Sequence, residues 1–133
     1  MQTPDFEKYS LALIKDNEVV YSSEKSGLRP VFECVSACKG KFNNCILHDK
    51  VMGLAAARVV VYSGMISEVI TLVASRLAKD LLEKNNIKLT ACNIVENILT
   101  KDKSRICPGE LKAQQITDNR DFFMHLNGIY SNK

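Results

Sequence analysis

Two adjacent ionisable residues, Asp49 and Lys50, lie where a short apolar run gives way to a nearly uncharged segment. The pattern predicts a strand at 45–47 and a helix at 51–62, with the Asp49 carboxylate as the helix N-cap and Gly64 as the residue that closes the helix. A cation at a helix start opposes the dipole, so Lys50 could instead hold a phosphate or carboxylate, or act as an amine nucleophile. The alternatives are an ordinary cap and a solvent-facing lysine.

Cys107 is the third candidate catalytic residue. It lies between a basic loop that contains Lys103 and Arg105 and a Pro-Gly turn, a setting that favours an exposed thiolate. A buried, inert thiol is the alternative. Glu110, just beyond the turn, is either a general base or an ordinary acidic residue in the first turn of a helix.

A second helix start is predicted at Ser26–Pro30, where Ser26 can act as N-cap and Pro30 fits the first turn. The helix is expected to run over about 28–38 and to end near Gly40. Arg29 could bind an anion through two hydrogen bonds, or it could be an exposed helix residue. The predicted ligand-binding residues are therefore Ser26, Gly27, Arg29, Gly53 and Glu110.

No metal site or cofactor is predicted. Five cysteines are present without any C-x-x-C pair, and a structural zinc site needs four ligands at characteristic spacing. The two histidines, His48 and His125, have neither a third ligand nor a paired nucleophile, so they are expected to be structural or solvated rather than catalytic.

Composition places the chain among ordinary globular domains. With 133 residues, 46% of them hydrophobic, it can form one core, and we expect one domain over residues 1–133. The net charge of +3 comes from scattered residues with no basic stripe, so nucleic acid is not expected as a partner. No apolar run suits a membrane span or a signal peptide, which predicts a cytoplasmic protein that does not bind membranes.

The order of predicted elements is typical of an α/β protein. A hairpin at 9–22 precedes strands at 45–47, 66–72 and 87–91, and these strands alternate with helices. We predict a three-layer α/β/α sandwich with a mixed five-stranded sheet in the order 2-1-3-4-5, the first strand alone antiparallel. Residues 94–99 fit either a strand or a helical turn. An amphipathic helix is predicted at 118–129.

Three strings carry a family resemblance: Ser26-Gly-Leu-Arg-Pro30, Asp49-Lys-Val-Met-Gly53 followed by Ala55-Ala-Ala57, and Cys107-Pro108. They resemble a small prokaryotic family of unknown function within the cytidine deaminase-like superfamily. The resemblance implies a pocket between two helix starts. Active deaminases carry H-x-E or C-x-E at the first start and P-C-x-x-C at the second, which provide three zinc ligands and a proton-carrying Glu. This chain has neither string, so zinc-dependent deamination is not expected.

These features favour a zinc-free protein that binds a small anionic or nucleotide-like ligand at the paired helix starts and could also catalyse a reaction there. The alternative is a non-catalytic, homo-oligomeric binding or assembly protein. The apolar helix at 51–62 and the aromatic residues Phe122 and Phe123 would then form the oligomer surface. A redox-sensing thiol protein is a third reading, based on cysteine number alone.

Overall fold

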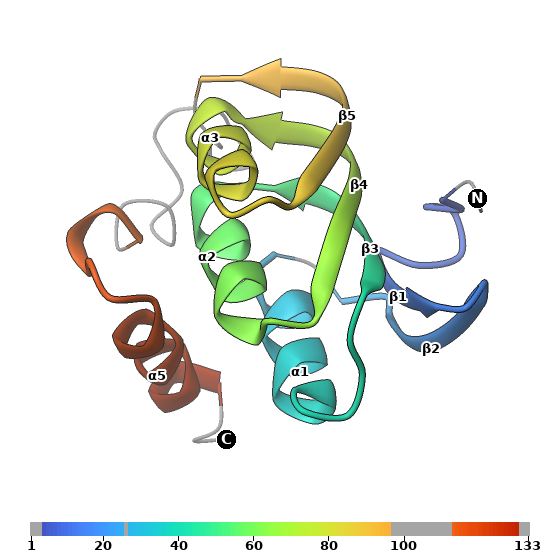
Figure 1. Ribbon diagram of the computed structural model, residues 1–133, viewed down its shortest axis with the longest axis horizontal. Helices are drawn as coiled ribbons and strands as arrows, with labels where there is room; N and C mark the ends of the chain where they lie inside the picture. Colours follow the sequence, from blue (N-terminus) through green and yellow to red (C-terminus); the bar gives the residue numbers. More distant parts are fainter. Residues whose placement is uncertain (1–3, 26, 97–112, 131–133) are drawn as a thin grey trace.

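The computed structural model describes residues 4–25, 27–96 and 113–130 (Figure 1). Five strands form one sheet in the order β2-β1-β3-β4-β5. β1 is antiparallel to both of its neighbours, and β3, β4 and β5 are parallel to one another. The predicted strand order and strand directions are therefore confirmed. The strands are β1 (Leu11–Lys15), β2 (Glu18–Ser23), β3 (Cys45–Met52), β4 (Ile66–Ser75) and β5 (Lys88–Val95).

The predicted hairpin forms through the two turn residues Asp16 and Asn17. Both have positive φ, at 53° and 66°, which two-residue turns between twisted strands require and which Asp and Asn tolerate. A register shift between Leu13 and Ile14 marks a bulge in the β1–β2 pair. The hairpin is thus closed by local turn chemistry, as the sequence indicates.

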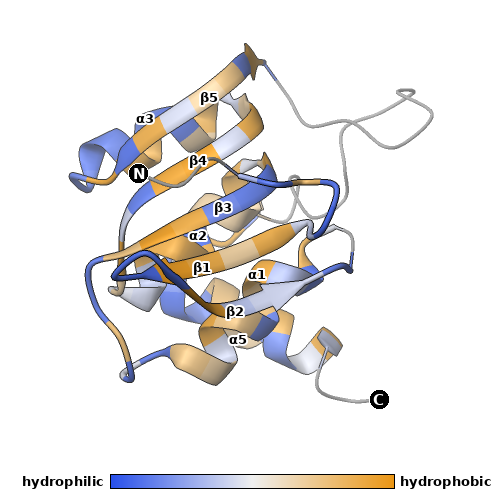
Figure 2. Ribbon diagram, turned by 90° about the vertical axis from the view of Figure 1, so that its right-hand side faces the viewer, coloured by the Kyte–Doolittle hydropathy of each residue, from blue (hydrophilic) through white to orange (hydrophobic). Residues whose placement is uncertain are grey.

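The helices lie on one face of the sheet. Those described are α1 (Arg29–Cys38), α2 (Leu54–Ser63), α3 (Arg76–Lys84) and α5 (Asn119–Tyr130). Three crossovers move in the same direction across the sheet: β2-α1-β3, β3-α2-β4 and β4-α3-β5. Because crossovers between parallel strands are right-handed, all three helices lie on the same face of the sheet. Figure 2 shows the sheet in front of all the labelled helices. The prediction that helices cover both faces is wrong for the described residues, because the strand order never reverses in the way that doubly wound sheets require.

α2 lies between the sheet and α5, which packs against the outer side of α2 and α1 (Figure 1). This position explains why α2 has few charges: it contacts apolar surface on two sides. The helix ends at Gly64, whose φ of +65° matches the predicted glycine stop. Phe122 and Phe123 are buried within the chain, and the Phe123 ring stacks on Tyr62 with centroids 4.6 Å apart. These two rings are therefore not an exposed oligomer surface.

The start of α2 differs from the prediction. β3 runs on through Met52, since Val51 and Met52 pair with Val73 and Ala74 of β4. Gly53 is the N-cap, with φ −89° and ψ 179° and no capping side chain. Asp49 is four residues too early to cap this helix and lies inside β3. The polar His48-Asp49-Lys50 run, which was expected to end the strand, is part of it.

The remaining elements follow the predicted order with shifted bounds. α1 ends at Cys38, and α3 begins one residue after its cap Ser75. β5 includes residues 94 and 95, so the strand reading holds for those two, and residues 97–99 lie outside the described part. None of the described helices has the length and apolar content needed to cross a membrane.

Candidate functional site

Three helix N-termini lie along one edge of the sheet. β2, β3 and β4 are parallel in sense, so their carboxyl ends share an edge, and α1, α2 and α3 start there. Only the α3 start has a capping side chain: Ser75 Oγ accepts a hydrogen bond from the Ala78 N–H at 3.2 Å. The N-caps of α1 and α2, Leu28 and Gly53, provide no side-chain cap. The starts of α1 and α2 therefore differ from a conventionally capped helix.

Asp49 lies on β3 just before this edge, with Leu11 and Thr71 as its strand partners. Its side chain is buried and accepts hydrogen bonds from the backbone N–H groups of Lys50 and Val51. Burial raises the pKa of Asp49 well above its usual range, and the two N–H donors offset this rise only in part. A carboxyl whose pKa is raised takes up a proton more readily, and in its protonated form it can donate a hydrogen bond or a proton as well as accept one.

Cys34 on α1 is buried, and it is near enough to Asp49 for the carboxylate to raise the pKa of its thiol further. Burial is the main cause that raises the pKa of the Cys34 thiol, followed by the influence of Cys38 and then of Asp49. Cys34, Cys38 and Cys45 are free and buried, so they act as small apolar side chains rather than as thiolates. The surroundings of Asp49 are therefore apolar and uncharged on this side.

Lys50 is exposed, in contrast to its neighbour. Successive side chains of a strand point to opposite faces, so Asp49 and Lys50 do not lie side by side as they would at a helix start. The Lys50 backbone N–H donates to the Ser10 carbonyl oxygen at 3.0 Å, which fixes the strand but not the amine. The structure thus separates the two residues that the sequence suggested would act together.

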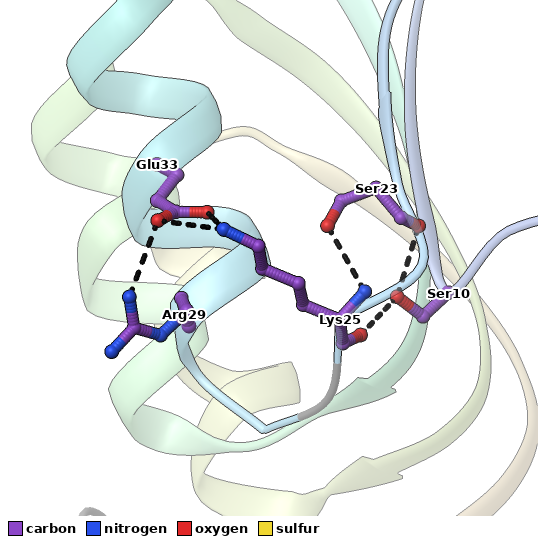
Figure 3. A network of polar contacts seen from close by, with 5 residues as sticks. All are labelled: Ser10, Ser23, Lys25, Arg29 and Glu33. Atoms are coloured by element: carbon purple, nitrogen blue, oxygen red, sulfur yellow. Dashed lines mark hydrogen bonds and ion pairs between the residues drawn. The ribbon is translucent and has the colours of Figure 1, made fainter.

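The loop before α1 is held by a polar network (Figure 3). Ser10 Oγ donates to the carbonyl oxygens of Ser23 and Lys25, which ties β1 to the end of β2 and to the loop. The Lys25 ammonium lies 3.0 Å from a Glu33 carboxylate oxygen. Sequence reasoning missed Ser10 and Ser23, because no local pattern distinguishes them from other strand-end serines.

Arg29 belongs to the same network. Its Nη1 lies 3.5 Å from Glu33 Oε2, and its guanidinium lies over the Tyr130 ring, 4.9 Å from the centroid. Gly27, in the loop, has a φ of +75°, which favours glycine. Arg29 therefore links the start of α1 to α5. Ser26, Cys107 and Glu110, three of the predicted site residues, lie outside the described residues.

His48, which neighbours Asp49 in β3, is buried and bonded to a residue far away in sequence. Its Nδ1 lies 2.8 Å from the Tyr9 hydroxyl, and the two rings are stacked. Burial lowers the pKa of His48. The described residues contain no group of three or more His, Cys, Asp or Glu side chains that could hold a metal ion.

An open depression of about 350 Å³ lies at the other edge of the sheet, lined by Lys15, Gly40, Lys41, Phe42 and Asn43. Lys15 Nζ donates to the Asn43 carbonyl oxygen at 2.7 Å. The depression lies near the start of β3, whereas Asp49 lies toward its end. It therefore does not include the candidate residues.

Comparison with known proteins yields a family and a fold. Residues 5–129 match the family model described as TM1506, a domain of unknown function (DUF1893). The crystal structure of the DUF1893 family protein TM1506 from Thermotoga maritima, at 2.70 Å resolution, is similar with a TM-score of 0.80 and 22% sequence identity. The match covers 94% of this chain and 83% of that one. No curated protein matches. At this identity, the structural likeness shows the fold alone.

Proposed function

Because the chain belongs to the DUF1893 family, a domain of unknown function, we propose a role from its own geometry: it binds a small anionic or nucleotide-like ligand at the carboxyl edge of the sheet. The binding region lies where α1 and α2 begin. Asp49 lies beneath it, and burial raises the pKa of its carboxyl. Lys50 is exposed on the opposite face of β3 from Asp49, so it would supply its positive charge to a ligand that extends beyond the end of this strand.

Asp49 is the observation that supports this proposal most. A buried carboxyl lowers stability unless it is paired or used, and the described residues give it no ion pair with Lys, Arg or His. Strongly shifted pKa values in such positions are concentrated at functional sites. A ligand that offers an acceptor to the protonated carboxyl would give this group the partner it lacks.

The location agrees with a general property of helices: their N-termini attract anions, and the starts of α1, α2 and α3 lie along this edge. We further propose that the chain is a member of the cytidine deaminase-like superfamily. The strand order 2-1-3-4-5 and the two helix starts at one edge support that assignment. Zinc chemistry is not proposed, since the starts of α1 and α2 lack the ligand strings of the active enzymes.

A thermal-shift screen of nucleotides, inorganic phosphate and small carboxylates tests the proposal. A binder should raise the melting temperature of the wild type. Asp49→Leu should lose most of that rise while remaining folded, since Leu is close to Asp in size but can neither donate nor accept a hydrogen bond. Lys50→Met should weaken an anionic binder about tenfold, because a charge-assisted contact is worth roughly 1.5–3 kcal/mol.

Lys84→Met is the matched control, because Lys84 is exposed in the last turn of α3, away from the helix starts. The affinity of the Lys84→Met variant for the same compound should equal that of the wild type. Binding that survives both Asp49→Leu and Lys50→Met would show that the ligand lies elsewhere. A screen without any binder among these three chemical classes would also count against the proposal.

A further inference from the structure

The two outer strands of the sheet differ in how well they are protected from pairing with another chain. β2 has six residues, a bulge in its pairing with β1, and a polar network at its end. β5 has eight residues, a regular register with β4 and no proline. Natural sheets protect their edges by short strands, bulges, charges or proline, and β5 has only Lys88 among these devices.

The surface beside β5 is apolar. Ile94 and Val95 are 39% and 36% exposed, and Leu72 of the adjacent strand is 37% exposed. Within residues 4–25, 27–96 and 113–130, no strand pairs with the outer side of β5. An open strand with an apolar side is a template for backbone pairing.

We propose that two copies of this chain pair through their β5 strands, antiparallel and related by a two-fold axis, so that one sheet continues across the dimer. Such an axis stands perpendicular to the sheet and keeps each side chain on its own face. One residue must therefore lie opposite itself at the centre. This requirement restricts the possible registers to a few.

Charge and apolar complementarity select the register centred on Cys92. In that register Lys88 lies opposite Glu96 of the second copy, and this contact occurs twice by symmetry. Leu89 lies opposite Val95, and Thr90 lies opposite Ile94. A register centred on Ala91 places Lys88 opposite Ile94. A register centred on Asn93 leaves Lys88 opposite a position beyond the end of β5. Neither register gives Lys88 an acidic partner. Opposite charges and apolar pairs directly across strands are both stabilising.

The two charged side chains are available for this contact. Lys88 is 69% exposed and lies 4.0 Å from Glu68 of its own chain. Glu96 is 76% exposed and contacts Arg76 at 3.0 Å. Both can therefore reach across the interface, and Glu96 would lie between Arg76 of its own chain and Lys88 of the other.

Sedimentation equilibrium of charge-swapped variants tests the proposal. The wild type should dimerise, whereas Lys88→Glu and Glu96→Lys should each weaken self-association about tenfold or more, because two attractions become two repulsions. Mixing the two variants should restore dimers, since each then meets its opposite charge, and the double variant should dimerise alone. Reversal of Glu83 to Lys on α3 is the control and should change nothing.

Cross-linking reports the register independently. In a Cys107→Ser background, mild oxidation with copper phenanthroline should join two chains through Cys92, the described cysteine that is exposed. Opposed residues of neighbouring strands lie about 4.5–5.5 Å apart, within disulfide reach. A monomeric wild type at about 100 µM, a dimer indifferent to both charge reversals, or a dimer that Cys92 does not cross-link would overturn the proposal.

Discussion

Two buried ionisable side chains, Arg58 and Asp49, are held in opposite ways. The Arg58 guanidinium on α2 donates to the Asn119 side chain at 2.8 Å and to the carbonyl oxygens of Ala113 and Ile116, and it lies over the Phe122 ring. These partners lie 55 to 64 residues later in the chain than Arg58. The Asp49 carboxyl accepts only from the N–H groups of the next two residues.

The difference separates a structural role from a candidate functional one. Arg58 fastens the C-terminal segment to α2 through the hydrogen bonds of its Nε and Nη1, although its Nη2 is buried without a hydrogen-bond partner among the described residues. Its pKa is lowered by burial, yet arginine remains charged. Asp49 fastens nothing distant, so its burial is not explained by the packing of the described residues. The predictions below change one of these residues at a time.

Arg58→Met should have the largest effect on stability. Methionine keeps most of the apolar stem but removes the donors to two carbonyl oxygens and one amide, so the unfolding free energy should fall by about 3 kcal/mol. Urea denaturation measures this loss, and limited proteolysis should show that α5 becomes accessible first.

Arg76→Met is the matched control, since Arg76 is exposed and has one ion pair with Glu96. It should change stability by less than about 1 kcal/mol. Equal losses for the two variants would contradict the view that Arg58 anchors the C-terminal segment.

Asp49→Asn should stabilise the protein at neutral pH. The raised pKa means that folded Asp49 binds its proton more tightly than unfolded Asp49, so the wild type loses stability as pH rises from the unfolded value, about 3.9, to the folded one. Each pKa unit of that rise is worth about 1.4 kcal/mol. The Asn variant lacks this loss. Its free energy of unfolding should equal that of the wild type near pH 3.5 and exceed it at pH 7.

Urea titrations at several pH values measure the difference. Asp80→Asn is the control, because Asp80 is exposed on α3. A wild-type curve that runs parallel to that of Asp49→Asn between pH 4 and 7 would show that burial does not alter the titration of this carboxyl.

Much of the fold could be predicted from sequence because it depends on local signals. Asp16 and Asn17 closed the hairpin, Gly64 ended α2, and the alternation of strands with helices indicated the sheet order. The one-sided helix layer was missed, although it follows from that order: successive right-handed crossovers in one direction keep helices on one face.

The candidate site was predicted less well, because its side chains are fixed by distant partners. His48 and Asp49 suggested the end of a strand, since an isolated strand would not bury them. In the folded chain Tyr9, 39 residues away, bonds to His48, and the core encloses Asp49. The predicted edge contains Gly27, Arg29, Asp49, Lys50 and Gly53. The sequence could not show that Asp49 and Lys50 point apart.

Tyr9→Phe should have the smallest effect and extends the comparison to His48, another buried ionisable side chain. Tyr9 Oη lies 2.8 Å from His48 Nδ1 and accepts from the Asp5 N–H at 3.1 Å, so the hydroxyl joins the N-terminal segment to β3. Its loss should lower the unfolding free energy by about 1 kcal/mol, the usual net value of one hydrogen bond.

The pH dependence distinguishes this residue from Asp49. The lowered pKa of His48 means that the unfolded chain binds more protons below about pH 6.5, so stability should fall as pH decreases through that value toward the folded pKa. This slope is opposite in sign to that of Asp49. A His48→Gln variant should lack it, and proton NMR of the imidazole should follow the titration directly. If the wild-type His48 titrates at 6.5 or above, the ring is solvated and Tyr9 does not bury it.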